Sequence, residues 1–174
     1  MNGRNRALSV KEIVLFALLG SILFLSKVIM ATLPNIHLVG MMIVTFTVVY
    51  RAKALFPIYV YVLAEGLFMG FGPWWVSYLY VWTILWGAVM LLPKSMPSKV
   101  ASVVYMLLCA AHGFLFGILF IPGQALALGW DMDTALAWVV AGLPFDAIHG
   151  VSNFVCAILV IPFSKLLRRL GRDL

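Results

Sequence analysis

The stretch Leu143-Pro-Phe-Asp146-Ala-Ile-His149-Gly-Val-Ser-Asn153 decides the fold, because it leads into the last long apolar run of the chain. It places Asp146, His149 and Asn153 at i, i+3 and i+7, which is a single face of a helix. An ionisable side chain at the centre of a membrane helix costs roughly 2.5–3.5 kcal/mol even on the lenient insertion scale. We therefore expect this face to line a polar pocket that the other helices close.

The composition predicts an all-α integral membrane protein. The chain has 174 residues, of which 64% are hydrophobic and 10% are charged, whereas a soluble domain is about one quarter charged. This length has room for about six spans of about 20 residues. Cys109 and Cys156 stand alone within apolar runs and imply no disulfide framework. The net charge of +6 does not indicate nucleic-acid binding, because the basic residues lie at the ends of apolar runs.

Six spans are predicted from the apolar runs and the Pro, Gly and basic residues between them. The first run has no small-residue cleavage site, so we interpret it as a retained span and not a signal peptide. Residues 134–167 are too long for one perpendicular span, and Pro144 offers a break. A short interfacial helix is therefore expected at about 134–142, after a loop over 122–133. The spans are predicted at about 13–33, 38–50, 55–71, 75–92, 100–121 and 144–167.

The basic residues predict the orientation of this six-helix bundle. Eleven of the twelve Lys and Arg lie in the N-terminal stub, the links after the second and fourth spans, and the C-terminal tail. With six spans these four places fall on one side of the membrane. By the positive-inside rule both termini are cytoplasmic, in the cytoplasmic membrane of a bacterium.

Five ionisable residues lie within the predicted spans, all toward the outer surface. Taken singly, Lys27 could snorkel to the outer headgroups, Glu65 could be a protonated or paired packing residue, and His112 could be a packing histidine. Their common depth with Asp146 and His149 favours a shared pocket. Pairing of Lys27 with Glu65 or Asp146 is compatible with either interpretation, since an unpaired charge would be expensive.

Aromatic residues extend the predicted pocket along the fourth span. Trp75, Tyr78, Trp82 and Trp86 follow at i, i+3, i+7 and i+11. Trp74 and Trp75 are also placed for an interfacial belt, and the deeper Trp82 and Trp86 belong either to the bundle core or to a stacking wall. The complete predicted substrate-binding set is Lys27, Glu65, Trp74, Trp75, Tyr78, Trp82, His112, Asp146, His149 and Asn153.

No motif indicates an enzyme, a cofactor or a metal site. The sequence has no P-loop, no His-Glu-x-x-His and no Gly-x-Ser-x-Gly, and His112 and His149 lack a third ligand at metal-binding spacing. Two alternatives to a binding protein stay open. One is a small membrane enzyme using Glu65, His112 and His149, and the other is a proton-coupled carrier with Lys27, Glu65 and Asp146 as its relay.

The segment Ala17-Leu-Leu-Gly-Ser21 resembles the Ala-x-x-x-Ala motif of the S components of energy-coupling factor (ECF) vitamin transporters. Ser21 departs from the motif but keeps the small size. Leu33-Pro-Asn-Ile36, Tyr78-Leu-Tyr-Val-Trp82 and Gly142-Leu-Pro-Phe-Asp146 are also similar to segments of that family. The resemblance covers nearly the whole chain.

The resemblance implies a transport subunit without its own ATPase. Ala17 and Ser21 would dock on a transmembrane T component that works with two cytoplasmic ATPases. The subunit would capture a vitamin outside, in a site built from the later helices and outer loops, and topple to release it inward. Cobalamin is the first candidate, and folate, a queuosine precursor, another vitamin and haem are the alternatives.

Overall fold

The computed structural model describes residues 8–171, and all regular structure in that range is helical. The prediction of an all-α protein is therefore confirmed. The elements are α1 (Val10–Ile29), α2 (Val39–Tyr50), η1 (Arg51–Ala54), α3 (Leu55–Met69), α4 (Pro73–Met90), α5 (Ser98–Phe114), α6 (Phe116–Leu128), α7 (Met132–Cys156), η2 (Ala157–Leu159) and α8 (Val160–Leu170).

Several of these helices have the length and composition of membrane spans. Three helical stretches are long and apolar enough to cross a bilayer, namely Val10–Ile29, Val39–Met69 and Met132–Leu170. A fourth arises if α5 and α6, which meet at a 44° bend, form one broken span. The indole and phenol groups of α4 lower its mean hydropathy, so α4 is not among them. The count of six spans stays a prediction.

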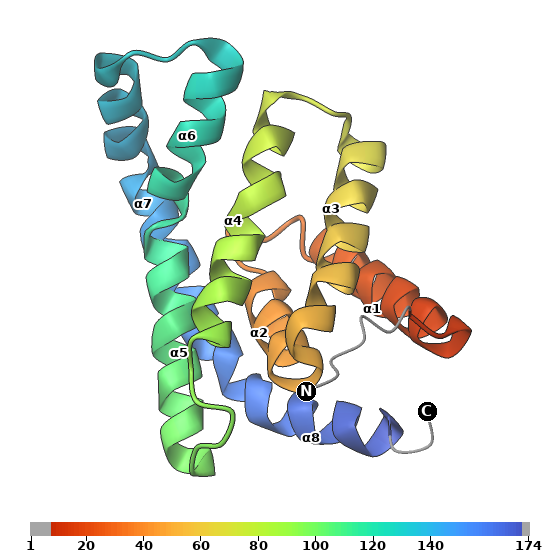
Figure 1. Cartoon of the computed structure of the whole chain (residues 1–174). Helices are drawn as coiled ribbons and strands as arrows, with labels where there is room; N and C mark the ends of the chain where they lie inside the picture. Colours follow the sequence, from red (N-terminus) through yellow and green to blue (C-terminus); the bar gives the residue numbers. More distant parts are fainter. Residues whose placement is uncertain (1–7, 172–174) are drawn as a thin grey trace, which may run out of the picture.

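Several connections between helices lie at two opposite ends of the molecule (Figure 1). The α3–α4 and α6–α7 links lie at one end, whereas η1, the α4–α5 link and α8 lie at the other. The basic residues of η1, the α4–α5 link and α8 thus lie at the same end of the molecule. The sequence predicts that these segments fall on one side. The α1–α2 link, residues 30–38, lies between the two ends in this view.

Helix ends follow from short-range hydrogen bonding. Ser9 and Glu12 form a capping box at the start of α1, and Glu12 also pairs with Lys53 of η1. Asp131 caps α7 by accepting from the Thr134 backbone N–H at 2.8 Å. Hydrogen bonds from Thr134 lower the pKa of this exposed carboxyl. These contacts fix where α1 and α7 begin.

The predicted break at Pro144 is wrong. Helix α7 runs through Pro144 from Met132 to Cys156, so there is no separate interfacial helix at 134–142. A proline removes one backbone N–H, and a membrane helix tolerates that loss where neighbouring groups satisfy the freed backbone carbonyl. The chain breaks instead at η2, and the amphipathic α8 then lies across the end of the bundle (Figure 1).

The predicted boundary at Ile121 is also wrong, because α6 continues through Pro122 to Leu128. Side chains of α4 replace the backbone hydrogen bonds disturbed there. The Tyr80 hydroxyl donates to the Leu119 carbonyl at 2.6 Å and accepts from the Gly123 N–H at 2.9 Å. The Ser77 hydroxyl donates to the Phe120 carbonyl at 3.0 Å. The span predicted at 100–121 is consequently two helices, and the loop predicted at 122–133 is mostly helix.

Close helix crossings hold these elements around the centre. A Cβ atom on Gly113 would lie 2.8 Å from the Cα atom of Gly150, so α5 and α7 meet backbone to backbone. A Cβ atom on Gly20 would lie 2.5 Å from Val60, which brings α1 equally close to α3. Helix α5 therefore packs tightly against α7, and α1 packs tightly against α3.

Candidate functional site

Three aromatic side chains form the centre of the site. Tyr78 and Trp82 of α4 lie with ring centroids 5.5 Å apart, and Trp82 lies 5.5 Å from Phe116 of α6. We call these three residues the central aromatic cluster. Trp82 is fully buried, and each of the polar groups described below borders this cluster.

A charged group lies against the Tyr78 side of the cluster. Lys27 Nζ donates to Glu65 Oε2 at 2.6 Å and to the Tyr78 hydroxyl oxygen at 3.1 Å. Glu65 is 2% exposed, whereas the Lys27 side chain is 30% exposed. Lys27 therefore pairs inside the bundle, and the pair satisfies the buried carboxylate.

A histidine group lies on the other side of the cluster. The His149 ring centroid is 4.7 Å from that of His37 and 4.7 Å from that of Phe116. His112 packs beside Trp82 at 5.6 Å, and one of its ring nitrogens lies 3.1 Å from the Val81 carbonyl. Burial, with the charge of Lys27, lowers the pKa of His37 in the α1–α2 link to about 4. His37 is therefore a neutral ring near pH 7.

His149 is the least satisfied polar group of the site. It is 1% exposed, and neither ring nitrogen has a hydrogen-bond partner within residues 8–171. His37 Nδ1 is likewise unpartnered in the described part of the chain. A buried polar atom without a partner costs about 1–3 kcal/mol. Such atoms beside a cavity indicate a place where a ligand would supply the partner.

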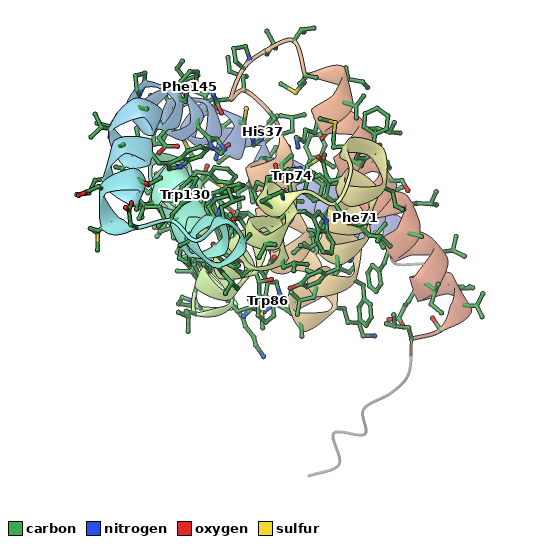
Figure 2. The ribbon with its side chains drawn as sticks, turned by 90° about the horizontal axis from the view of Figure 1, so that it is seen from above. His37, Phe71, Trp74, Trp86, Trp130 and Phe145 are labelled. Carbon is green, nitrogen blue, oxygen red and sulfur yellow. The ribbon has the colours of Figure 1, made fainter. Side chains whose placement is uncertain are left out.

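A cavity of about 250 Å³ opens between the two groups. We call it the inner cavity. Figure 2 views the molecule from the end that carries the α3–α4 link. It shows His37 between α7 and the pair α1 and α2. The cavity is lined by Lys27, Met30, Ala31, Leu33, Pro34, Asn35, Ile36, His37, Tyr78, Phe116 and His149.

A second cavity of about 400 Å³, here the lateral cavity, adjoins the first, since Asn35 and Phe116 line both. Its other walls come from α6 and α7, including Trp138 and Asp146. Both carboxylate oxygens of Asp146 lie 3.1 Å from the Gly117 backbone N–H, which donates to them. This bond holds the carboxylate at the cavity wall.

The structure brings together eight of the ten predicted site residues. Those that line a cavity are Lys27, Tyr78, His149 and Asp146. Four more are in contact with a lining residue or with the cluster, namely Glu65, Trp74, Trp82 and His112. Asp146, His149 and Asn153 are all buried on α7, as the face predicted from their spacing requires.

The other two predicted residues, Trp75 and Asn153, line neither cavity and bond to neighbouring helices. Trp75 Nε1 of α4 donates to the Val62 carbonyl of α3 at 2.8 Å. Asn153 Nδ2 donates to the Cys109 carbonyl at 3.4 Å, between α7 and α5. These side chains join helices to one another, so their contacts are structural.

The predicted aromatic stripe therefore divides. Tyr78 and Trp82 face the centre, whereas Trp86 Nε1 donates to the Arg51 carbonyl at 3.1 Å near the basic end of the bundle. Of these three residues only Tyr78 lines the inner cavity, whereas Trp82 is buried behind it in the bundle core.

Sequence reasoning missed the contribution of the α1–α2 link. Asn35 and His37 of this link line the inner cavity, as do Phe116 and His149 from distant helices. One signal was available: Asn35 and His37 are polar residues in a short link that contains no Lys or Arg. Phe116 and Trp138 gave no signal, because apolar aromatics are common throughout the chain.

The positions of the ionisable side chains can be compared with those that a metal site or a proton relay would need. Within residues 8–171, no group of three or more His, Cys, Asp or Glu is arranged to hold a metal ion. Asp146 makes no hydrogen bond or ion pair with Lys27 or Glu65 in the same range. A relay from Lys27 to Asp146 would therefore lack a direct contact.

The segment that resembles a docking motif lies on an open face of α1. Ala17 and Ser21 are exposed, together with the neighbouring Val14 and Leu18. The Ser21 hydroxyl donates to the Ala17 carbonyl at 2.9 Å. Since its only donor is satisfied within the helix, Ser21 presents a small surface much like that of alanine.

No family model, curated protein or solved structure matches the chain. Its function therefore has to follow from the chemistry of these two cavities and of the open α1 face.

Proposed function

We propose that this chain is the substrate-binding membrane subunit, or S component, of an ECF-type importer for a vitamin or related micronutrient. The observation that carries the proposal is the inner cavity, where Lys27, Tyr78, His37 and His149 meet inside an apolar helical protein. Buried polar groups are expensive in such a protein, and unpartnered imidazoles at a cavity favour a ligand site. The proposed arrangement has six spans, with both termini in the cytoplasm.

The chemistry of the inner cavity suits a flat heterocycle with hydrogen-bonding edges. Lys27 is already balanced by Glu65, so the cavity does not call for a charged partner. The imidazoles of His37 and His149 can each donate or accept a hydrogen bond. The rings of Tyr78 and Phe116 offer apolar faces for stacking.

The cavity volumes favour a ligand, or part of one, with a small ring system. The inner cavity, of about 250 Å³, is smaller than the roughly 300–1,000 Å³ typical of ligand pockets, and the lateral cavity, of about 400 Å³, lies at the low end of that range. Cobalamin, the first candidate from the family resemblance, is larger than either cavity. Its binding would require the α1–α2 link to move, whereas a pterin-sized or purine-sized ring would fit without that movement.

The energy for transport would come from partners. The proposed complex contains a T component and two cytoplasmic ATPases, since the chain has no nucleotide-binding motif of its own. The exposed α1 face around Ala17 and Ser21 is the proposed docking surface. Replacing Ser21 with Trp should prevent co-purification with co-expressed partners. Val103→Trp, on the exposed face of α5, is the matched control and should leave the complex intact.

Ligand binding by the isolated chain is the direct test. The full chain is purified in detergent and titrated with a vitamin panel that includes cobalamin, folate and queuosine precursors, with tryptophan fluorescence as the readout. We expect one compound to bind with a submicromolar Kd and to change the fluorescence, because Trp82 packs against Tyr78 and Phe116, which line the inner cavity. Absence of binding across the panel, with the protein folded, would contradict the proposal.

A further inference from the structure

A separate cavity of about 220 Å³ lies at the end of the molecule that carries α8. Its walls come from the end of α2, the α4–α5 link, the first half of α5, and α8. It shares no residue with the inner or lateral cavity. The proposed vitamin site does not account for it.

Three basic side chains line this cavity, namely Lys94 from the α4–α5 link and Lys165 and Arg168 from α8. Arg168 Nη2 donates to the Val48 carbonyl at 3.2 Å, which holds the guanidinium at the cavity. No Asp or Glu of the described chain lines it, and Glu12 pairs with Lys53 elsewhere. Positively charged side chains around a cavity that has no carboxylate favour the binding of an anion.

A buried hydroxyl provides an observation independent of the charges. Ser164 also lines the cavity, is only 4% exposed, and its Oγ atom has no hydrogen-bond partner within residues 8–171. A buried hydroxyl without a partner is costly. A phosphate oxygen in the cavity would accept a hydrogen bond from this hydroxyl as well as from the basic side chains.

The surroundings distinguish a lipid from a soluble anion. Met96 and Ile161 give the cavity an apolar wall, and α8 exposes Phe163, Leu166 and Leu170 beside its basic residues. A helix with both kinds of residue lies in the membrane interface, at the level of the headgroups. A ligand with a phosphate and an apolar tail would therefore meet both kinds of surface.

We propose that the cavity formed by Lys94, Ser164, Lys165 and Arg168 binds the phosphate of an anionic phospholipid headgroup. The lipid would hold α8 against the α4–α5 link at one surface of the membrane. This site is independent of the vitamin site, so either proposal can fail without the other.

The test is lipid binding to the delipidated full chain, measured by native mass spectrometry with phosphatidylglycerol and, in parallel, with phosphatidylcholine. Lys94→Gln/Lys165→Gln removes two charges from the cavity. Lys99→Gln/Arg169→Gln removes two nearby charges that do not line it. At about 1 kcal/mol for each basic residue, the first variant should bind phosphatidylglycerol about 30-fold more weakly. The control should change the affinity by less than about 3-fold.

Ser164→Ala keeps every charge and should still weaken phosphatidylglycerol binding several-fold, which guards against a double variant that fails to fold. Equal loss in the two double variants would overturn the proposal, because diffuse surface charge would then explain binding. Equal binding of phosphatidylcholine would overturn it as well. A third arm uses inorganic phosphate. If inorganic phosphate binds and its binding depends on Ser164, while phosphatidylglycerol does not bind, the ligand is a soluble anion and the lipid proposal is wrong.

Discussion

The two polar groups on either side of the central aromatic cluster are built differently. On one side, Lys27, Glu65 and Tyr78 satisfy one another through bonds of 2.6 and 3.1 Å. On the other, His149 and His37 keep ring nitrogens without partners in the described chain. In the first group the charged and hydroxyl groups have hydrogen-bond partners within the protein, as in a structural ion pair. In the second group the ring nitrogens have none within the described residues. Stability and ligand binding should therefore respond to different residues.

The largest effect is expected from breaking the ion pair. Lys27→Met leaves the Glu65 carboxylate buried without its cation, which should lower the free energy of unfolding by about 3 kcal/mol. That figure is the low end of the usual range, because Lys27 is partly exposed. Thermal unfolding of the detergent-purified chain measures the loss, and Lys11→Met, on an exposed part of α1, is the control.

The double variant Lys27→Met/Glu65→Leu tests whether the lost stability comes from the unpaired Glu65 carboxylate. Removing both charges should recover most of the lost stability, since an apolar pair of similar volume often replaces a buried ion pair at no cost. If Lys27→Met keeps full stability and loses only ligand binding, the pair belongs to the ligand site and the contrast between the two groups fails.

Removing the Tyr78 hydroxyl should have the next largest effect. Tyr78→Phe deletes the oxygen that accepts from Lys27 Nζ and should cost about 1.5 kcal/mol, as expected for a hydrogen bond to a partly exposed charged group. Tyr61→Phe is the matched control, because the buried Tyr61 hydroxyl has no partner in residues 8–171. Equal losses of unfolding free energy in the two variants would show that the Lys27 contact contributes nothing.

His149→Phe should separate binding from stability. It keeps a ring in place but removes both ring nitrogens, so vitamin affinity should fall at least about tenfold, roughly 1.4 kcal/mol. The unfolding free energy should not fall, because those nitrogens bond nothing within the described protein. Fluorescence titration and thermal unfolding of the same preparation measure both quantities. Unchanged affinity would remove His149 from the site.

His112→Phe should show the opposite pattern, and the smallest effect. His112 loses its contact with the Val81 carbonyl, which should reduce the unfolding free energy by about 1 kcal/mol. Because His112 lines neither cavity, the vitamin affinity should stay within about threefold of the parent. A large loss of affinity would place His112 in the ligand site together with His149.

These contrasts also show what the sequence can predict. The spacing of Asp146, His149 and Asn153 correctly predicts one buried face of α7, since helical periodicity is a local property. The cost of an ionisable group in an apolar chain correctly indicates that Lys27 and Glu65 lie inside the bundle and not toward lipid. Both inferences need only the residues themselves and the nature of the solvent.

The misses depend on contacts between distant segments. Pro122 and Pro144 both lie inside helices. For Pro122, Tyr80 of another helix supplies the missing hydrogen bonds, which no local pattern predicts. His37 enters the site only because the α1–α2 link folds against α7. Trp75 leaves the predicted set because its indole finds a carbonyl on α3.

The most direct measurement is mass spectrometry of small molecules that co-purify with the full chain and with its His149→Phe variant. If the unpartnered histidines and the central aromatic cluster form a receptacle, the parent protein should retain one heterocyclic compound in near-stoichiometric amount. The variant should retain at most a tenth of it at equal protein recovery. Identical compounds in equal amounts from both proteins would contradict a ligand site between His37, Tyr78 and His149.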